Sequence, residues 1–472
     1  MKIILRIVGL LIILNSVLLY MHYSQMADAS GTSHKESRYV QEIEVINRED
    51  ALFVKHHFRN LDHGRHELVF PIESRNRACL LETESSCSRF NENVTAILEG
   101  EENEQSISYE IPKSGHFESR KLFKEPFAVL RNAKPDSTIL HMTDESGIGG
   151  MWVSGLEMVG FKKMDMVDYT MFKGNGKVTD LYWQRNSLPQ VYKGDRLSIF
   201  GNSIDNEVAE ELHDRLVELG AQHIAIVLDP QGKPLQSSRF LISERPVTEL
   251  TDAVLESGVR SLYAIPGNEQ LVAGLIASIY IDAPIGTERA KAVFESLKHS
   301  LTTTQYEMVR SRLAEQKGER LNAAALDEVI GEVSGWKTSF VQKNVEGNYP
   351  FLLEDSRTVH MNGEAQEDIQ VVIKDKQTLY PANKLLTRNG YSMSSNESSI
   401  YIENENEKFR FSLRDPFYVL NEKRYELRER PYVLIGNEYY FEEDALRRLF
   451  QLSIQKNEET IVVTSLAGGE SS

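Results

Sequence analysis

Residues 247–286 read VTELTDAVLESGVRSLYAIPGNEQLVAGLIASIYIDAPIG, and this stretch decides how the middle of the chain folds. Apolar residues recur in it with the spacing that places them on one face of a helix. We predict helices near residues 246–256 and 268–282, with Pro246 in the first turn, where a missing N–H costs no hydrogen bond. This part of the chain is therefore expected to be α-rich, with further helices near residues 287–299, 303–317 and 322–333.

Upstream of this stretch the sequence predicts one more helix and a buried strand. Asp205 is placed to cap the helix and Gly220 to end it. Residues 223–229, HIAIVLD, have the apolar run of a buried strand. The helix is expected to bury one face, which carries Val208, Leu212, Leu216 and Leu219.

The central stretch resembles the core of gluzincin metallopeptidases, which carry His-Glu-x-x-His on one helix and a third zinc ligand, Glu, on the next. Two His at i and i+4 lie on one helix face and hold the metal, and the Glu between them activates its water. In this resemblance Glu249 matches the general base, while Thr248 and Asp252 stand at the two His positions. Glu269 stands where the third ligand would be, and the likeness extends loosely over residues 223–344.

The departures from that motif decide the expected chemistry. Thr is a poor zinc ligand, and carboxylates alone do not replace an imidazole-rich site. We therefore expect no catalytic residue, no metal and no cofactor here, and treat Thr248, Glu249, Asp252 and Glu269 as candidates for a relic site. The alternative is that these residues belong to ordinary amphipathic helices.

Residues 366–466 contain an internal repeat with an offset of 61 residues. Each copy has an apolar entry, a short helix, a turn with Asn and a closing strand. This pattern resembles the copper amine oxidase N-terminal-like domain, or stalk domain, which implies a presenting or binding module and not a metal site. The sequence departs from the family at Phe441, where Pro is usual, and at Gln451, which replaces the Gly390 of the first copy. The repeated residues are Leu385, Asn396, Ile400 and Ile402, which recur as Leu446, Asn457, Ile461 and Val463.

The rest of the chain completes a multidomain α+β prediction. Short apolar stretches separated by turn residues predict a β-sandwich-like domain over residues 38–135 and a β-rich segment over 136–204 that joins the next domain. The α-rich, peptidase-like domain then covers residues 205–345, and the stalk-like domain covers 366–466.

The first 28 residues predict a membrane segment. Lys2 and Arg6 precede an uncharged, largely apolar run over residues 7–27. Such a run after positive charges predicts a single-pass anchor with the bulk of the chain outside the cytoplasm. The alternative is secretion after cleavage near Ala29, because Ala27-Asp28-Ala29 fits a signal-peptidase site.

Charge and cysteine content narrow the function further. The net charge is −17, from 53 basic and 70 acidic residues, which argues against a nucleic-acid partner. Cys79 and Cys87 are the only cysteines, and export would let them form a disulfide. His56, His57, His63 and His66 are expected to be solvated strand and turn residues in preference to metal ligands.

Together these features predict a membrane-anchored, extracytoplasmic binding or scaffold protein of a bacterial cell envelope, with an inactive peptidase-like domain. Its partner would be an envelope protein, a peptide or a wall polymer. The alternative is an extracytoplasmic metallopeptidase or other hydrolase with non-standard ligands.

Overall fold

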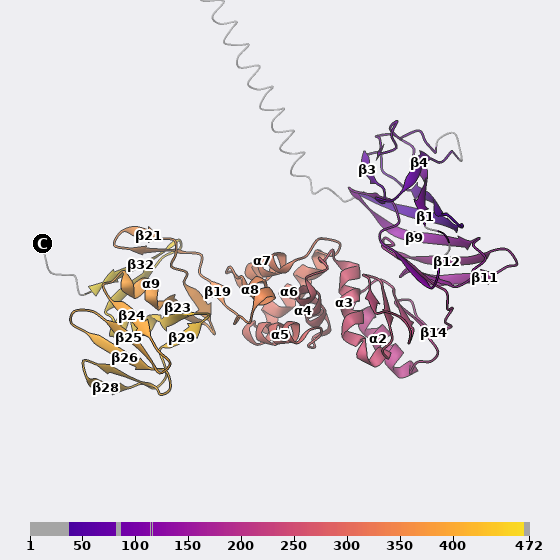
Figure 1. The fold of residues 1–472 in the computed structure, drawn as a ribbon. Coiled ribbons are helices and arrows are strands. Elements are labelled where there is room, and N and C mark those ends of the chain that lie inside the picture. The colour runs from indigo at the N-terminus through magenta and orange to yellow at the C-terminus, as the bar shows by residue number, and fades with distance from the viewer. Residues whose placement is uncertain (1–36, 82–85, 114, 116, 467–472) are drawn as a thin grey trace, which may run out of the picture. The chain divides into compact units, whose positions relative to one another are not determined.

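The computed structural model describes residues 37–81, 86–113, 115 and 117–466, so the predicted membrane segment and cleavage site lie outside the described residues (Figure 1). The chain divides into two compact units, Met1–Ser187 and Leu188–Ser472. Within the described residues the fold is mixed α+β, with several sheets and nine α-helices. None of the helices in this part of the chain is long and apolar enough to cross a membrane.

The first unit is built on a seven-stranded sheet in the order β11-β12-β9-β1-β2-β6-β4. Strand β1 (Ser37–Asn47) alternates buried and half-buried residues, as a strand with one face on the core does. Strand β9 (Ala133–Asp144) runs parallel to β1 and crosses the boundary suggested near residue 135. The other strands of this sheet are β2 (Ala51–Arg59), β4 (Arg75–Cys79), β6 (Gln105–Pro112), β11 (Glu157–Lys163) and β12 (Asp168–Asn175).

Two three-stranded sheets complete the described part of the first unit, in the orders β10-β13-β7 and β5-β3-β8. Trp152 and Trp183 pair across β10 and β13, and both are buried in the core. These tryptophans therefore pack as core residues. The strands are β3 (His66–Val69), β5 (Ala96–Ile97), β7 (Arg120–Phe123), β8 (Val129–Leu130), β10 (Met151–Val153) and β13 (Leu181–Gln184).

The second unit begins with a five-stranded sheet in the order β14-β15-β16-β18-β17. Helix α2 (Asn206–Leu219) starts where the Asp205 side chain accepts a hydrogen bond from Glu207 N, and it ends at Gly220, whose φ is 69°. Both caps and the buried strand β16 (Ile224–Leu228) confirm the sequence prediction. The remaining strands are β14 (Gln190–Lys193), β15 (Leu197–Phe200), β17 (Leu235–Gln236) and β18 (Phe240–Ser243).

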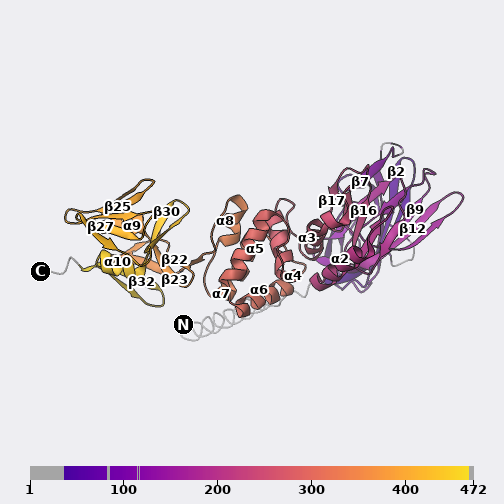
Figure 2. The same ribbon diagram turned by 90° about the horizontal axis from the view of Figure 1, so that it is seen from below.

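The α-rich region follows, and the helices α4 to α7 group together in both ribbon views (Figures 1 and 2). The prediction of a helix near residues 246–256 was wrong at its start. Val247–Glu249 form a separate 3₁₀ turn, η1, and the α-helix begins only at Thr251. The helices are α3 (Thr251–Leu262), α4 (Gln270–Ile281), α5 (Glu288–Ser300), α6 (Thr303–Glu315), α7 (Ala323–Ser334) and α8 (Phe340–Glu346).

The C-terminal part repeats one unit of strand, short helix and two strands. In the first copy these are β23 (Gln377–Pro381), α9 (Ala382–Thr387), β24 (Ser392–Ser395) and β25 (Ser399–Glu403). In the second copy they are β30 (Glu438–Glu442), α10 (Glu443–Leu449), β31 (Leu452–Lys456) and β32 (Thr460–Ser465).

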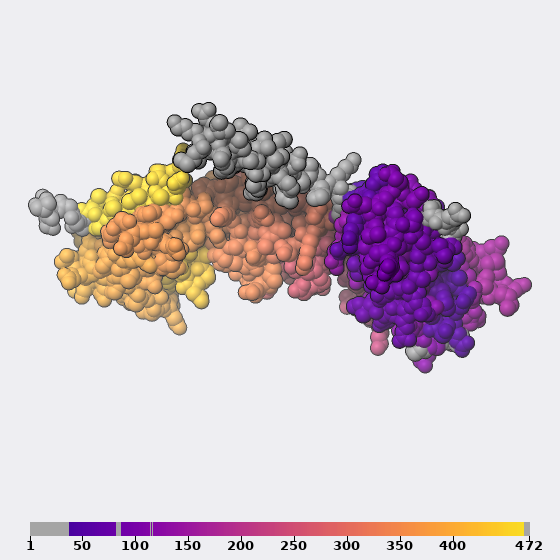
Figure 3. Space-filling view, turned by 90° about the horizontal axis from the view of Figure 1, so that it is seen from above, coloured from indigo at the N-terminus to yellow at the C-terminus, as the bar shows by residue number. Residues whose placement is uncertain are grey.

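The two copies join through equivalent residues. Strands β23 and β30 pair antiparallel with Tyr380 opposite Phe441, and these two buried residues are separated by the repeat length. Antiparallel pairing of equivalent positions creates a local approximate two-fold axis. The repeat forms one continuous body, orange to yellow in the space-filling view (Figure 3).

Eight further strands surround the repeat. They form parts of a five-stranded sheet β19-β22-β23-β30-β29, a four-stranded sheet β21-β20-β32-β31 and a five-stranded sheet β24-β25-β26-β27-β28. The strands are β19 (Leu353–Glu354), β20 (Thr358–Met361), β21 (Glu364–Gln366), β22 (Val372–Lys374), β26 (Lys408–Ser412), β27 (Phe417–Leu420), β28 (Lys423–Glu426) and β29 (Tyr432–Ile435).

Candidate functional site

The candidate site predicted from the sequence is divided between two elements. Thr248 and Glu249 are exposed in the turn η1, whereas Asp252 lies in the first turn of α3. Leu250 separates η1 from α3 with φ −105° and ψ −3°. The positions that match the two zinc-binding histidines are therefore not on one helix face, which is the geometry that the motif requires.

Asp252 has a structural partner on a neighbouring helix. Its carboxylate lies 3.2 Å from the ammonium of Lys291 on α5. Hydrogen bonding to Asp252 and the attraction between the two charges raise the pKa of Lys291. This ion pair links α3 with α5 at a half-exposed position.

Glu269 was expected on the second helix, but it is the residue that precedes α4. Its Oε2 accepts a hydrogen bond of 2.9 Å from the backbone N–H of Ala323, the first residue of α7. Asn322 caps the same helix end by accepting from Ala325 N. Since the first N–H groups of a helix have no partner within it, Glu269 contributes to capping α7.

Two residues that the sequence analysis missed, Glu256 and Arg260, lie on α3 and interact electrostatically. Arg260 donates from Nη1 to the carbonyls of Ile265 and Pro266, both at 3.1 Å, and from Nη2 to the carbonyl of Glu269 at 3.5 Å. Glu256 lies one helical turn earlier and is 7% exposed. The spacing of four residues between a Glu and an Arg was the available sequence signal.

The environment of Glu256 disfavours its charged form. Burial raises its pKa to about 7, the charge of Arg260 opposes this shift, and that of Asp252 adds to it. A Cβ atom at Gly286 would lie only 2.8 Å from Glu256 Oε1, so the carboxyl packs against that backbone. The positive charge that acts on Glu256 is the guanidinium of Arg260.

Among the described residues, no group of three or more His, Cys, Asp or Glu is placed to hold a metal ion. The histidine cluster is also dispersed. His56 bonds Gln41 at 3.0 Å, His57 bonds Ser106 at 2.9 Å and His66 bonds Asp62 at 2.8 Å.

The prediction that these histidines are solvated was wrong for His56, His57 and His66, which are buried. Strand alternation sends His56 and His57 to opposite faces, but both faces of this part of β2 are covered. Burial, together with the neighbouring His57, lowers the pKa of His56 to about 3.

The predicted disulfide is confirmed. Cys79, at the end of β4, is bonded to Cys87, with their Cα atoms 5.8 Å apart. The bond closes a short loop beside the edge of the seven-stranded sheet.

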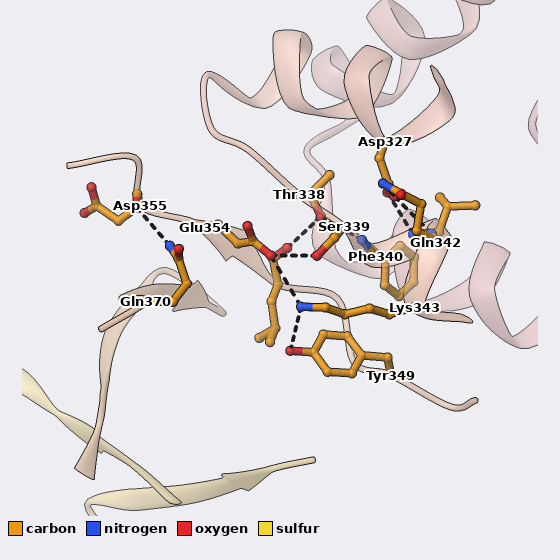
Figure 4. Close-up of polar contacts among 12 residues, drawn as sticks. Asp327, Thr338, Ser339, Phe340, Gln342, Lys343, Tyr349, Glu354, Asp355 and Gln370 are labelled. Atoms are coloured by element: carbon orange, nitrogen blue, oxygen red, sulfur yellow. Dashed lines mark hydrogen bonds and ion pairs between the residues drawn. The ribbon is translucent and has the colours of Figure 1, made fainter. Parts of the chain in front are cut away.

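The segment after α7 forms a polar network that joins α8 to β19 (Figure 4). Asp327 accepts hydrogen bonds from the backbone N–H groups of Val341 and Gln342, at 2.8 and 3.0 Å. Ser339 and Lys343 both contact Glu354, at 2.6 and 3.4 Å. Because each of these charged groups has a partner within the network, we interpret the network as structural.

No family model matches the chain, and no curated protein matches it. Among solved structures, the M1 zinc metallopeptidase from Deinococcus radiodurans covers 65% of this chain and 91% of its own length, with 8% identity and a TM-score of 0.40. A mutant of that enzyme bound to a Tyr-Ser-Ala substrate covers 65% and 92%, with 9% identity and a TM-score of 0.43. These neighbours are similar at a level too low to assign an activity or a site to this chain.

Proposed function

We propose that this protein is a non-catalytic binding or scaffold protein held at the outer face of a bacterial membrane by residues 7–27. In this proposal its helical domain has a peptidase-like fold and does not catalyse peptide hydrolysis. Its C-terminal repeat is a stalk-like module that presents or binds a partner. The partner is an envelope protein, a peptide or a wall polymer.

The observation that carries the proposal is the Arg260 guanidinium near Glu256 of α3 and Glu269, the residue that precedes α4. Arg260 interacts electrostatically with both Glu256 and Glu269, and its N–H groups hold three carbonyls of the connecting loop. Arg260 therefore places a positive charge of the chain itself beside these two acids. A second cation would meet repulsion from it.

Helix α3 also favours a different register for the resemblance to gluzincins. His-Glu-x-x-His requires a single helix with its Glu aimed at the site. Glu256 lies on a single helix, and the two flanking positions are then the buried Leu255 and Val259. Neither apolar side chain binds zinc, so the proposal of an inactive domain is the same in either register.

The Cys79–Cys87 disulfide supports the proposed location. Disulfides persist in oxidising spaces outside the cytoplasm and are rare inside it. The net charge of −17 is in keeping with a partner other than nucleic acid.

The test measures zinc content and peptide hydrolysis of the full chain purified in detergent. We expect no stoichiometric zinc and no hydrolysis that chelation removes. Glu256→Gln serves as the control, since it should leave any trace hydrolysis by contaminants unchanged. Stoichiometric zinc, together with hydrolysis lost both on chelation and in Glu256→Gln, would establish the enzyme alternative instead.

A further inference from the structure

Among the residues that the structure describes, strand β29 is an unpaired edge of the sheet β19-β22-β23-β30-β29. The carbonyl of Pro431 accepts a hydrogen bond of 3.0 Å from Glu442 N. Because hydrogen-bonded and non-bonded pairs alternate in an antiparallel ladder, Val433 then faces its partner strand. Tyr432 and Leu434 direct their N–H and C=O groups the other way, toward the open edge.

A groove runs along this edge. It has a volume of about 720 Å³, within the range of sites that bind ligands. One side is the loop after β26, which is fixed where Tyr432 OH donates to the carbonyl of Ser412 and Arg430 donates to that of Leu413. Residues that line the groove include Leu413, Arg414, Arg430, Tyr432, Leu434 and Tyr439.

The groove carries an excess of positive charge. Arg414 and Arg430 line it together with one acid, Glu429. Within the described part of the chain, the guanidinium of Arg414 makes no hydrogen bond or ion pair, and Arg430 uses one N–H on a neutral carbonyl. Guanidinium forks of this kind match a carboxylate in geometry and charge.

The apolar surface beside these charges is also unusual for an edge strand. Leu434 is 53% exposed, and β29 itself contains no charged residue. Edge strands usually carry charges or bulges that prevent pairing with another chain. In β29 neither is present among its four residues, and Pro431, which has no N–H to donate, lies just before the strand.

We propose that β29 binds an extended, carboxylate-bearing peptide segment of another protein as an added strand. Its main chain would pair with the outward groups of Tyr432 and Leu434, and alternate side chains would enter the groove. A carboxylate would meet Arg414 and Arg430. This inference rests on the binding role proposed for the C-terminal repeat and names its kind of partner, and it does not depend on whether the helical domain is catalytic.

A peptide fits these features better than other occupants do. Outward N–H and C=O groups at every second residue match a peptide backbone, whereas a glycan lacks that repeat. A second copy of the chain would bring its own Arg414 and Arg430 to the same edge, where the like charges repel.

The experiment pans a displayed library of random nonapeptides against the full chain in detergent, and measures synthetic winners by fluorescence anisotropy. We expect enrichment of sequences with an Asp or Glu beside alternating apolar residues. Leu434→Pro should abolish binding because it removes an outward N–H without removing a bond to β30, whereas Leu434→Ala keeps the N–H and should retain it. Arg414→Gln should weaken the binding of an acidic peptide about tenfold. It should weaken far less the binding of the same peptide with its carboxylate replaced by an amide.

If Leu434→Pro fails to fold, peptides N-methylated at alternate amides test whether binding occurs by strand addition. One of the two N-methylation patterns should abolish binding, since it blocks strand addition. Equal affinity for both patterns, full affinity in folded Leu434→Pro, or a library without enrichment would overturn the proposal. Binding of purified wall sacculi without peptide binding would overturn it in favour of a polymer, and dimerisation lost in Leu434→Pro would overturn it in favour of self-association. The zinc and hydrolysis assays are unaffected by any of these results.

Discussion

The carboxyl of Glu256 couples the stability of the helical region to pH. Its pKa is raised from 4.5 to about 7, mainly by burial. Between these values the unfolded chain releases the proton while the folded chain keeps it, so the unfolded state binds fewer protons. The contribution of Glu256 to stability is therefore fully present below pH 4.5 and is lost as the pH rises through about 7.

Glu256→Gln should remove this dependence, because the amide has a similar shape and does not ionise. At pH 8 the variant is expected to be more stable than the wild type, by at most roughly 3 kcal/mol, and near pH 4.5 the two should be similar. Urea unfolding followed by circular dichroism across this range checks it. Parallel pH profiles of the two proteins would contradict the assignment.

Glu269 and Glu249 offer a matched pair of acids from the predicted site. Glu269→Ala should lower the free energy of unfolding by about 1–2 kcal/mol, because the N–H of Ala323 loses its acceptor at the start of α7. Glu249→Ala, at an exposed position in η1, should change it by less than about 0.5 kcal/mol. Denaturant unfolding of both variants measures the difference. Equal effects would mean that the cap contributes nothing.

At the scale of the elements, the two copies of the C-terminal repeat form the turn after their helix with different residues. Gly390 follows the helix α9 with φ 83°, and its equivalent Gln451 follows α10 with φ 51°. Left-handed backbone is unfavourable for a residue with a Cβ and free of that penalty for glycine. The second copy therefore carries local strain that the first copy lacks.

Gln451→Gly should raise the stability of this region by about 0.5–1 kcal/mol by relieving that strain. The reciprocal variant Gly390→Gln should lower it by about 1–2 kcal/mol, since a Cβ there meets no atom within 4 Å and the cost is conformational alone. Thermal unfolding of both variants tests the pair. A stabilising Gly390→Gln would show that the equivalence of the two turns is mistaken.

The disulfide constrains a short loop beside β4. Cys79 and Cys87 are separated by eight residues, and the chain-entropy model assigns such a loop about 2–3 kcal/mol. Replacing both with Ser should lower the stability of the first unit by that amount, as should a reductant acting on the wild type. Thiol titration of unreduced native protein should find no free thiol. Two free thiols in fresh protein would contradict the disulfide.

At the scale of the whole molecule, the N-terminal charges and the apolar run predict that residues 30–472 lie outside the cytoplasm. Protease added to intact spheroplasts should therefore digest the bulk of the chain. A cytoplasmic marker protein serves as the control and should survive. Full protection of the chain in the same sample would refute the predicted orientation.

Several features of the fold were predictable because local physics specifies them. Asp205 and Gly220 mark the ends of α2 through cap chemistry that needs no distant contact. The repeat was visible as recurring residues, and the structure adds that its copies pair through Tyr380 and Phe441. The start of α3 was misplaced because Pro246 and Leu250 allow either a 3₁₀ turn or a helix, and packing selects between them.

By itself the sequence determined the mixed α+β class, the helix α2 with both of its caps, the repeat and the pairing of the only two cysteines, since these follow from periodicity, capping and the small number of thiols. Only the tertiary structure decided what the polar residues do. In the structure Glu269 caps the start of α7, Asp252 pairs with Lys291, and the partly buried Arg260 lies near Glu256. Burial and hydrogen-bond partners arise from segments distant in sequence, and a motif spacing carries no information about them.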